Sequence, residues 1–131
     1  MSEIEEKSGC VRTVLEFDTY QKMAHETADY PEGCIGGFNA NHVNYFYPAL
    51  GLAEEAGEVA GKFAKAVRDK KGAIDSDRKN EIAKELGDVL WFVAELCTCL
   101  DISMQAVADN NLAKLASRKA RGVIHGEGDN R

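Results

Sequence analysis

Apolar residues recur every three to four positions over most of the chain, which is the pattern of amphipathic helices. The pattern predicts four helices, and strand-like alternation is absent. The first predicted helix covers residues 13–30 and ends before Pro31. The second begins at Val43 or Pro48 and ends at Asp69, and the third and fourth cover residues 78–100 and 103–119. Four such helices with short connections favour an all-α fold, a four-helix antiparallel bundle whose second and third helices form the central hairpin.

The segments between these helices carry turn and capping signals. The stretch "PEGCIGGFNANH" (31–42) is rich in Gly and Asn and predicts a loop long enough to be suspected of function. The stretch "KKGAIDSD" (70–77) separates the second and third helices, and Asp75, Ser76 or Asp77 is expected to cap the third. Ser103 is the expected cap of the fourth helix.

Length and composition indicate one globular domain over residues 1–131. Within it, residues 1–12 are expected to form a loose N-terminal lead-in and residues 120–131 a Gly-rich tail that cannot continue the helix. Four cysteines without a C-x-x-C spacing are expected to be reduced thiols.

The charge balance excludes several classes of partner. The net charge is -6 and the basic residues are scattered, so no DNA or RNA polymer is expected as a ligand. No apolar run reaches the roughly 20 residues that a membrane span requires, and the start of the chain is acidic, unlike a signal peptide. We therefore expect a cytoplasmic protein that does not bind membranes.

Two pairs of acidic residues stand out on the predicted hairpin. Glu55 and Glu58 are three apart on the second helix, and Glu85 and Asp88 are three apart on the third. Residues at this spacing share a helix face, where like charges repel by roughly 0.2 to 0.5 kcal/mol unless a cation lies between them. If the two helices pack antiparallel, all four carboxylates can surround one space.

The chemistry of this set favours a hard cation. Oxygen ligands suit Mg²⁺ or Mn²⁺, whereas zinc prefers His and Cys, and no Glu-x-x-His motif of a di-iron bundle is present. Magnesium commonly joins carboxylates to substrate phosphates, which points to a nucleotide or another polyphosphate. Ordinary surface pairing, such as Glu58 with Lys62 or Glu81 with Lys84, is the alternative that spacing alone leaves open.

The words "GLAEEAGEVA", "ELGDVLWFVAEL" and "NLAKLASR" resemble the MazG-like all-α nucleoside triphosphate pyrophosphatases, over roughly residues 20–131. The family pattern E-x-x-E followed by E-x-x-D corresponds here to "EAGE" (55–58) and "ELGD" (85–88). The resemblance implies metal-assisted hydrolysis at the α-phosphorus of a nucleoside triphosphate, which releases the monophosphate and pyrophosphate. It also implies a homodimer or a dimer of dimers, with sites at helix interfaces.

The resemblance further assigns roles to individual residues. It implies that the Mg²⁺ ligands and catalytic carboxylates are Glu55, Glu58, Glu85 and Asp88. The residues expected to bind the substrate are Lys62, Lys65, Asn111, Lys114 and Arg118. For Glu54 and Glu81 two interpretations stay open: they orient the metal ligands or a metal-bound water, or they are solvated surface residues. For Trp91 and Phe92, stacking on a nucleobase and packing in the core both stay open.

The choice of substrate is the least constrained expectation. The compact chain and the "GEGDNR" ending are similar to phage members and to the MazZ group, which favours dGTP or GTP as substrate and the host cytoplasm as the location if the gene is a phage gene. A dCTP or dUTP pyrophosphatase of the same superfamily is the alternative enzyme. A non-catalytic helical module that binds nucleotide is the alternative outside enzymes. The tail is expected to fold over the nucleotide or over a neighbouring subunit.

Overall fold

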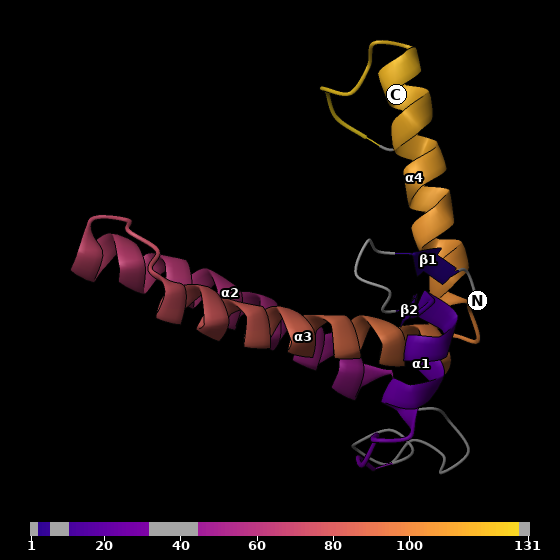
Figure 1. Ribbon diagram of the computed structural model, residues 1–131, viewed down its shortest axis with the longest axis horizontal. Coiled ribbons are helices and arrows are strands. Elements are labelled where there is room, and N and C mark those ends of the chain that lie inside the picture. The colour runs from indigo at the N-terminus through magenta and orange to yellow at the C-terminus, as the bar shows by residue number, and fades with distance from the viewer. Residues whose placement is uncertain (1–2, 6–10, 32–44, 129–131) are drawn as a thin grey trace.

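The computed structural model describes residues 3–5, 11–31 and 45–128, and this part of the chain is dominated by four helices (Figure 1). The helices are α1 (Phe17–His25), α2 (Phe46–Lys70), α3 (Ser76–Cys99) and α4 (Met104–Ala120). The prediction of four helices and a mainly helical fold is therefore confirmed. The predicted loop at 31–42 lies largely outside the described residues.

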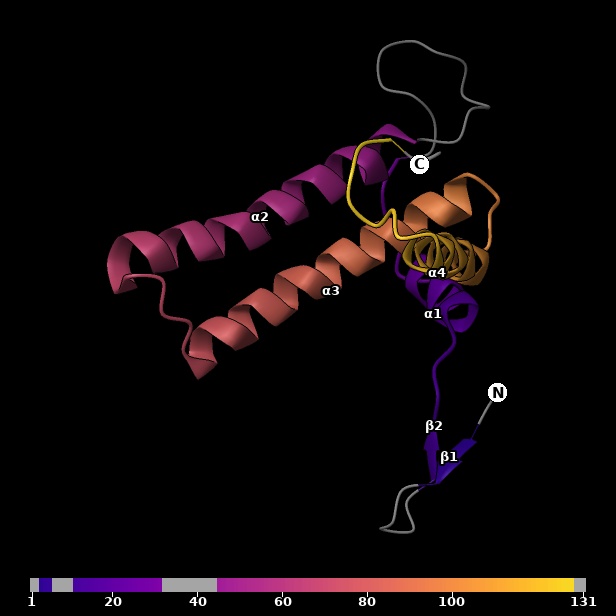
Figure 2. The same cartoon turned by 90° about the horizontal axis from the view of Figure 1, so that it is seen from above.

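Helices α2 and α3 lie side by side and run antiparallel, as Figures 1 and 2 show. The turn between them uses left-handed backbone at Lys71 (φ 53°) and Gly72 (φ 84°), which ends α2. Helix α3 then begins under a side-chain cap, because the carboxylate of Asp75 accepts a hydrogen bond of 2.9 Å from the backbone N–H of Arg78. The predicted hairpin and one of its three candidate caps are confirmed.

The buried core lies where α1 crosses the C-terminal half of α3. Its buried members are Ala24, Ala94, Cys97 and Met104. Trp91 packs against this cluster, and its indole N–H donates to Thr27 Oγ1 at 2.8 Å and to the carbonyl oxygen of Ala24 at 3.2 Å. Trp91 is therefore a core residue that joins α3 to α1, which decides between its two interpretations.

Helix α4 leaves this core in a new direction. The chain bends by 106° between α3 and α4, and α4 contacts α1 and α3 but not α2 among the described elements (Figure 1). The expected antiparallel four-helix bundle is thus corrected for a single chain, which forms a hairpin with two further helices at one end. Consequently the apolar face of α4 stays exposed, as at Leu112, which is 64% exposed.

Polar side chains of α1 hold the first turn of α4 and explain the bend. Asp18 accepts hydrogen bonds from the Ser103 hydroxyl at 2.7 Å and from the Gln105 backbone N–H at 3.0 Å. The side-chain oxygen of Gln21 accepts a bond of 2.8 Å from the Met104 N–H. Ser103 itself caps α4 by accepting from the Ala106 N–H, as predicted. These bonds satisfy the otherwise unpaired donors of the helix start and fix its direction.

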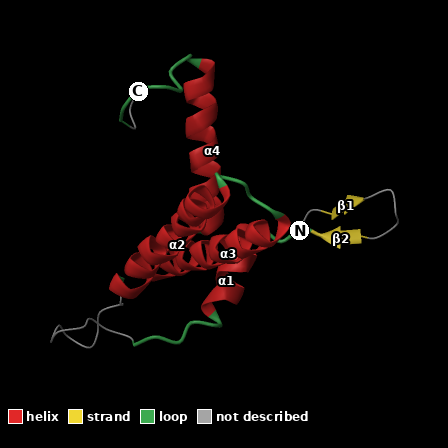
Figure 3. Cartoon of the chain, turned by 90° about the vertical axis from the view of Figure 1, so that its left-hand side faces the viewer, coloured by secondary structure: helices red, strands yellow, loops and turns green. Residues whose placement is uncertain are grey.

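The N-terminal region contains a short β-hairpin that the sequence pattern did not reveal. Strands β1 (Glu3–Glu5) and β2 (Val11–Thr13) pair antiparallel, with Ile4 opposite Arg12 (Figure 3). The expectations of no strands and of a helix from Thr13 are corrected accordingly, whereas the loose lead-in over residues 1–12 stays a prediction. Three-residue strands are too short to produce a recognisable alternation.

Two remaining expectations concern membranes and thiols. Among the described residues, no single helix is both long enough and apolar enough to span a membrane. Helices α3 and α4 reach the required length and apolar composition only when they are counted together as one bent pair. Cys97 and Cys99 are free thiols, as expected. Cys10 and Cys34 lie outside the described residues.

Candidate metal centre

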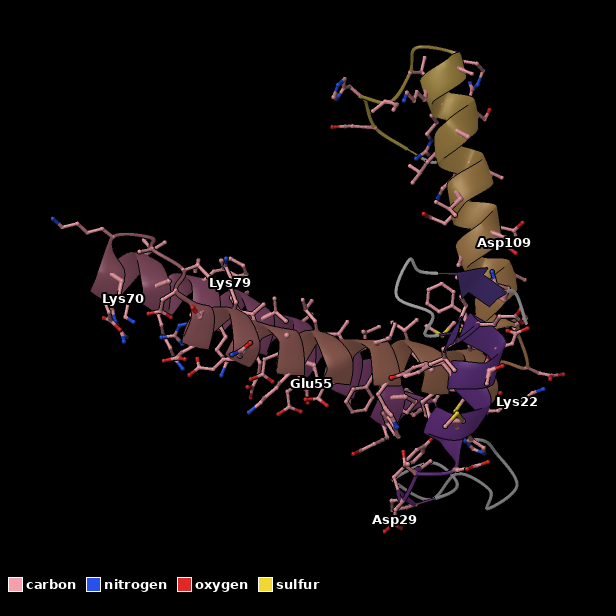
Figure 4. All side chains as sticks on the ribbon, viewed as in Figure 1. Lys22, Asp29, Glu55, Lys70, Lys79 and Asp109 are labelled. Carbon is pink, nitrogen blue, oxygen red and sulfur yellow. The ribbon has the colours of Figure 1, made fainter. Side chains whose placement is uncertain are left out.

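Three of the four predicted metal ligands come together midway along the α2–α3 hairpin. Glu55 on α2 and Glu85 and Asp88 on α3 each offer a carboxylate oxygen, and these oxygens lie within 4.8 Å of one another. We call these three residues the carboxylate trio. Figure 4 shows Glu55 on the hairpin, away from α4. The antiparallel packing of α2 and α3 therefore brings together three of the four carboxylates in the predicted set.

A close helix contact lies one turn away from the trio. Gly51 is buried on α2, and a Cβ at this position would lie 2.3 Å from ring atoms of Phe92 on α3. Glu55 follows Gly51 by one helical turn, and Asp88 precedes Phe92 by one turn. The absence of a side chain at Gly51 thus lets the two helices approach closely beside the ligands.

The fourth predicted ligand, Glu58, lies outside the trio. Its side chain is exposed, and its carboxylate is not among the oxygens that converge. Glu58 is nevertheless one turn from Glu55 on the same helix face, and its charge helps to raise the pKa of Glu55. It is close enough to act on the trio electrostatically without joining it.

Repulsion among these groups is visible at Glu55. Its pKa lies above the ordinary value, first because partial burial disfavours the charged form and then because the carboxylate of Asp88 repels it. The negative charges of Glu58, Glu85 and Glu54 add to this effect. A cation placed between these residues would relieve the repulsion.

Lys62 reaches across the hairpin to the trio. Its Nζ lies 2.9 Å from Oε1 of Glu85, and the two side chains are only 20% and 15% exposed. The bond to Glu85 raises the pKa of Lys62, so its charged form is favoured. The sequence suggested Glu58 as the partner one turn away on α2, whereas the structure pairs Lys62 with a carboxylate of the opposite helix.

The trio fits a hard divalent cation. Its donors are all carboxylate oxygens, and His and Cys are not among them, which suits Mg²⁺ or Mn²⁺ better than zinc. Ligand oxygens on opposite sides of an octahedral Mg²⁺ lie about 4 Å apart. Adjacent ligand oxygens lie about 3 Å apart, so the spacing within 4.8 Å in the trio is near the range that one ion requires.

Other candidate residues of the hairpin lie around the trio without joining it. Glu81 forms an ion pair of 2.7 Å with Arg78, one turn earlier on α3, instead of the expected pair with Lys84. Glu54 and Lys65 are exposed on α2. Glu81 is therefore an exposed residue that pairs with its neighbour on α3.

The three substrate-binding candidates of α4 are not brought to the trio within one chain. Asn111, Lys114 and Arg118 lie on a helix that does not contact α2 (Figure 1). Arg118 is only 5% exposed, and one of its guanidinium nitrogens donates to the carbonyl oxygen of Gly128 at 3.4 Å. The tail therefore folds back along α4, at least as far as Gly128.

A buried polar network that sequence reasoning missed lies at the other end of α3. Glu95 is 1% exposed and accepts a hydrogen bond of 2.5 Å from the Tyr30 hydroxyl, while Nδ1 of His25 lies 3.1 Å from its other oxygen. Burial and the contacts with Cys99 and Glu95 raise the pKa of Tyr30. Glu95 within the apolar run "WFVAEL" was the available signal, because a carboxylate on a core-facing position requires partners.

An aromatic chain connects this network with the neighbourhood of the trio. The rings of Tyr30 and Tyr47 stack with centroids 4.6 Å apart, and the Tyr47 ring centroid is 5.9 Å from that of Phe92. The Phe92 ring is in turn perpendicular to the Trp91 ring, with centroids 4.9 Å apart. Phe92 thus belongs to the packing between α2 and α3. Its ring lies beside Gly51, one turn from the trio.

Comparisons of the sequence with known proteins point to one family. Residues 48–123 match the model of a family described as the MazG nucleotide pyrophosphohydrolase domain, and this range contains the trio and all candidate substrate residues. The chain is 44% identical over 118 residues to the Gene 37 protein of Mycobacterium phage L5, an alignment that covers 89% of this chain and 100% of that protein. No solved structure matches the chain.

Proposed function

The chain belongs to the MazG nucleotide pyrophosphohydrolase family, and we propose that it hydrolyses nucleoside triphosphates to monophosphate and pyrophosphate with Mg²⁺, for which Mn²⁺ can substitute. The observation that carries the proposal is the convergence of carboxylate oxygens from two antiparallel helices. We take residues 1–131 as a single MazG-like domain.

In this proposal Glu55, Glu85 and Asp88 hold the metal, and Glu58 turns inward to join them. A bound divalent ion would polarise phosphate oxygens and lower the pKa of a water molecule that attacks the α-phosphorus. The carboxylates of the chain fix the position of that chemistry, because they project from two helices held together at Gly51 and Phe92. Glu54 and Glu81 lie outside the trio and would support the site from its edge.

The phosphates need cations that a single chain supplies only in part. Lys62 and Lys65 lie on the same helix as Glu55, whereas Lys114 and Arg118 lie on α4, away from the trio. We propose that Asn111, Lys114 and Arg118 act on the site of a second copy in a homodimer or a dimer of dimers. A composite site of this kind explains why the metal ligands and the basic face of α4 are separate in the monomer.

Exposed apolar surface supports self-association. Large apolar side chains are exposed on both parts of the molecule, namely Phe63, Val67, Leu86 and Leu90 on the hairpin and Val107, Leu112 and Leu115 on α4. Pairing the α4 face of one copy with the hairpin of another would bury both surfaces and complete a bundle between chains. The net charge of -6 is consistent with the absence of DNA or RNA polymers as partners.

The substrate is proposed as dGTP or GTP, in the cytoplasm, or the host cytoplasm for a phage gene. Similarity to a phage protein is in keeping with the phage-type ending that suggested this choice. A dCTP or dUTP pyrophosphatase is the second candidate, and a nucleotide-binding module without activity is the third. The intact trio favours an enzyme over the third candidate.

One screen tests the function. The purified protein is incubated with each of the eight common ribo- and deoxyribonucleoside triphosphates and Mg²⁺, and products are separated by chromatography, with an EDTA sample and the Asp88→Asn variant as controls. We expect monophosphate and pyrophosphate that depend on Mg²⁺ and on Asp88, with guanine nucleotides cleaved fastest. Diphosphate and orthophosphate would contradict attack at the α-phosphorus, and no product from any nucleotide would favour the non-catalytic module.

A further inference from the structure

Lys62 and the carboxylate trio share one residue. The side chain of Glu85 contributes an oxygen to the trio and also accepts the Lys62 ammonium group at 2.9 Å. Both side chains are largely shielded from water, so this contact is better defined than an ordinary surface ion pair. The lysine therefore binds the same Glu85 carboxylate that is proposed to bind the metal.

The two cations interfere with each other at this position. A Mg²⁺ or Mn²⁺ ion binds a carboxylate oxygen at about 2.1 Å. With Lys62 on the same carboxylate, the ammonium nitrogen and the ion would lie within about 5 Å of each other, a separation at which like charges repel appreciably even at a protein surface. Binding of the ion thus favours departure of the lysine.

We propose that Lys62 is the resident counter-ion of the metal site and that it leaves Glu85 when a divalent ion binds. In the metal-free protein its charge offsets part of the repulsion among the carboxylates. Its flexible four-carbon stem allows the ammonium group to move away without a change in the helices. This inference rests on the proposed function, since it concerns the same site.

The replacement of Lys62 by a divalent ion at Glu85 affects the affinity of the site for metal. An ion that binds is repelled by the Lys62 ammonium group on Glu85, so wild-type protein binds metal more weakly than a protein in which this ion pair is absent. The displaced ammonium group can then bind a phosphate oxygen of the substrate, which restores its charge pairing. Lys62 in this way links tight metal binding to the arrival of the triphosphate.

The test measures Mn²⁺ binding without nucleotide, by the electron paramagnetic resonance signal of free Mn²⁺, in the full chain. Lys62→Met removes the charge and keeps most of the side-chain volume. The matched control is Lys84→Met, which makes the same change of charge beside Glu85, at an exposed position about 100° around the helix. Lys62→Arg keeps the charge, and Lys62→Gln replaces Lys62→Met in the test if the latter loses helical content.

We expect Lys62→Met to lower the Mn²⁺ Kd about threefold to tenfold, as the loss of a well-defined competing ion pair implies. Lys84→Met should leave the Kd within about twofold of wild type, and Lys62→Arg should not tighten binding. Metal-free Lys62→Met should also melt at a lower temperature than wild type and gain more from Mn²⁺.

The outcomes separate this inference from the proposed function. If Lys62→Met binds Mn²⁺ no more tightly than wild type, or if Lys84→Met tightens binding as much as Lys62→Met, the proposed role of Lys62 is wrong. Neither result would contradict the metal site itself. A wild-type protein that binds no Mn²⁺ would overturn the metal site itself and the counter-ion with it.

Discussion

Gly51 on α2 lies against the ring of Phe92 on α3, and the ring occupies the position that a side chain at residue 51 would take. An added Cβ would lie 2.3 Å from the ring, a distance that real Cβ atoms do not tolerate. Glu55 lies one turn after Gly51 on α2, and Asp88 lies one turn before Phe92 on α3. The Gly51–Phe92 contact therefore lies one turn from the carboxylate trio, where a change in the separation of α2 and α3 would affect both the hairpin and the trio.

We predict that Gly51→Ala lowers the free energy of unfolding by about 1 to 3 kcal/mol, since overpacking forces the ring or the helices to shift. Gly61→Ala on the same helix meets nothing within 4 Å and should stabilise by about 0.5 to 1 kcal/mol, as alanine generally does in a helix. Urea unfolding measures both. Mn²⁺ titration should show weaker binding in Gly51→Ala alone, and equal stability of the two variants would mean that the contact does not set the spacing.

The hairpin and its carboxylate trio could be predicted because they depend on local signals. The periodicity of apolar residues predicts the buried faces of α2 and α3, and Asp75 marks the start of α3. Antiparallel packing of the two helices then brings Glu55 and Asp88 close to each other. Glu58 shows the limit of this reasoning. Spacing places it on the right face, but the rotamer of an exposed side chain depends on the charges around it, and here Glu58 stays outside.

The direction of α4 could not be predicted from local signals. Periodicity identifies an apolar face but not the surface that covers it. The bend depends on hydrogen bonds that Asp18 and Gln21 accept from α4, and these partners lie more than 80 positions apart in the sequence. The burial of Glu95 depends likewise on Tyr30 and His25, and such long-range polar contacts leave no periodic trace.

Loss of a single ligand should abolish activity without unfolding the chain. We predict that Asp88→Asn and Glu58→Gln each lower kcat by at least about 100-fold, because an amide retains volume but not the charge that holds the metal. Far-ultraviolet circular dichroism should be unchanged, and the metal-free variants should be as stable as wild type or slightly more stable, since repulsion is reduced. Asp77→Asn, an exposed carboxylate in the first turn of α3, is the control.

The two variants also separate the trio from Glu58. Asp88→Asn should weaken Mn²⁺ binding in the absence of nucleotide, whereas Glu58→Gln should have a smaller effect there and act mainly when substrate is present. Near-normal turnover of Glu58→Gln would confine the metal site to the three residues that the structure brings together.

The corner between α1 and α4 should respond to acid. The pKa of Asp18 lies below its ordinary value of 3.8, mainly because its carboxylate accepts a hydrogen bond from the Gln105 N–H and next because it accepts one from Ser103. A lowered folded-state pKa contributes stability above pH 3.8, and this contribution is lost as the pH falls through the folded-state pKa. We predict that Asp18→Ala is less stable than wild type near neutral pH and that the difference shrinks in acid.

Urea unfolding from about pH 7 to about pH 3 checks this prediction. Thr19→Ala, an exposed change at the next position of α1, should give a pH-independent difference from wild type. A constant difference for Asp18→Ala over the same range would show that its carboxylate does not favour the charged form in the folded protein.

The separation of the trio from α4 leads to a prediction about mixed oligomers. If Lys114 and Arg118 act on the site of a second copy, a Lys114→Ala/Arg118→Ala variant and an Asp88→Asn variant should each be nearly inactive alone. Refolding equal amounts of the two together gives mixed dimers in which one site carries both defects and the other carries none. About a quarter of all sites are then intact if subunits mix at random in a dimer with two sites. We expect the mixture to regain about a quarter of wild-type turnover, measured as pyrophosphate release.

Circular dichroism of the double variant checks that loss of the buried Arg118 has not unfolded α4. A mixture no more active than its parents would mean that the basic face of α4 serves its own chain or does not contact the substrate.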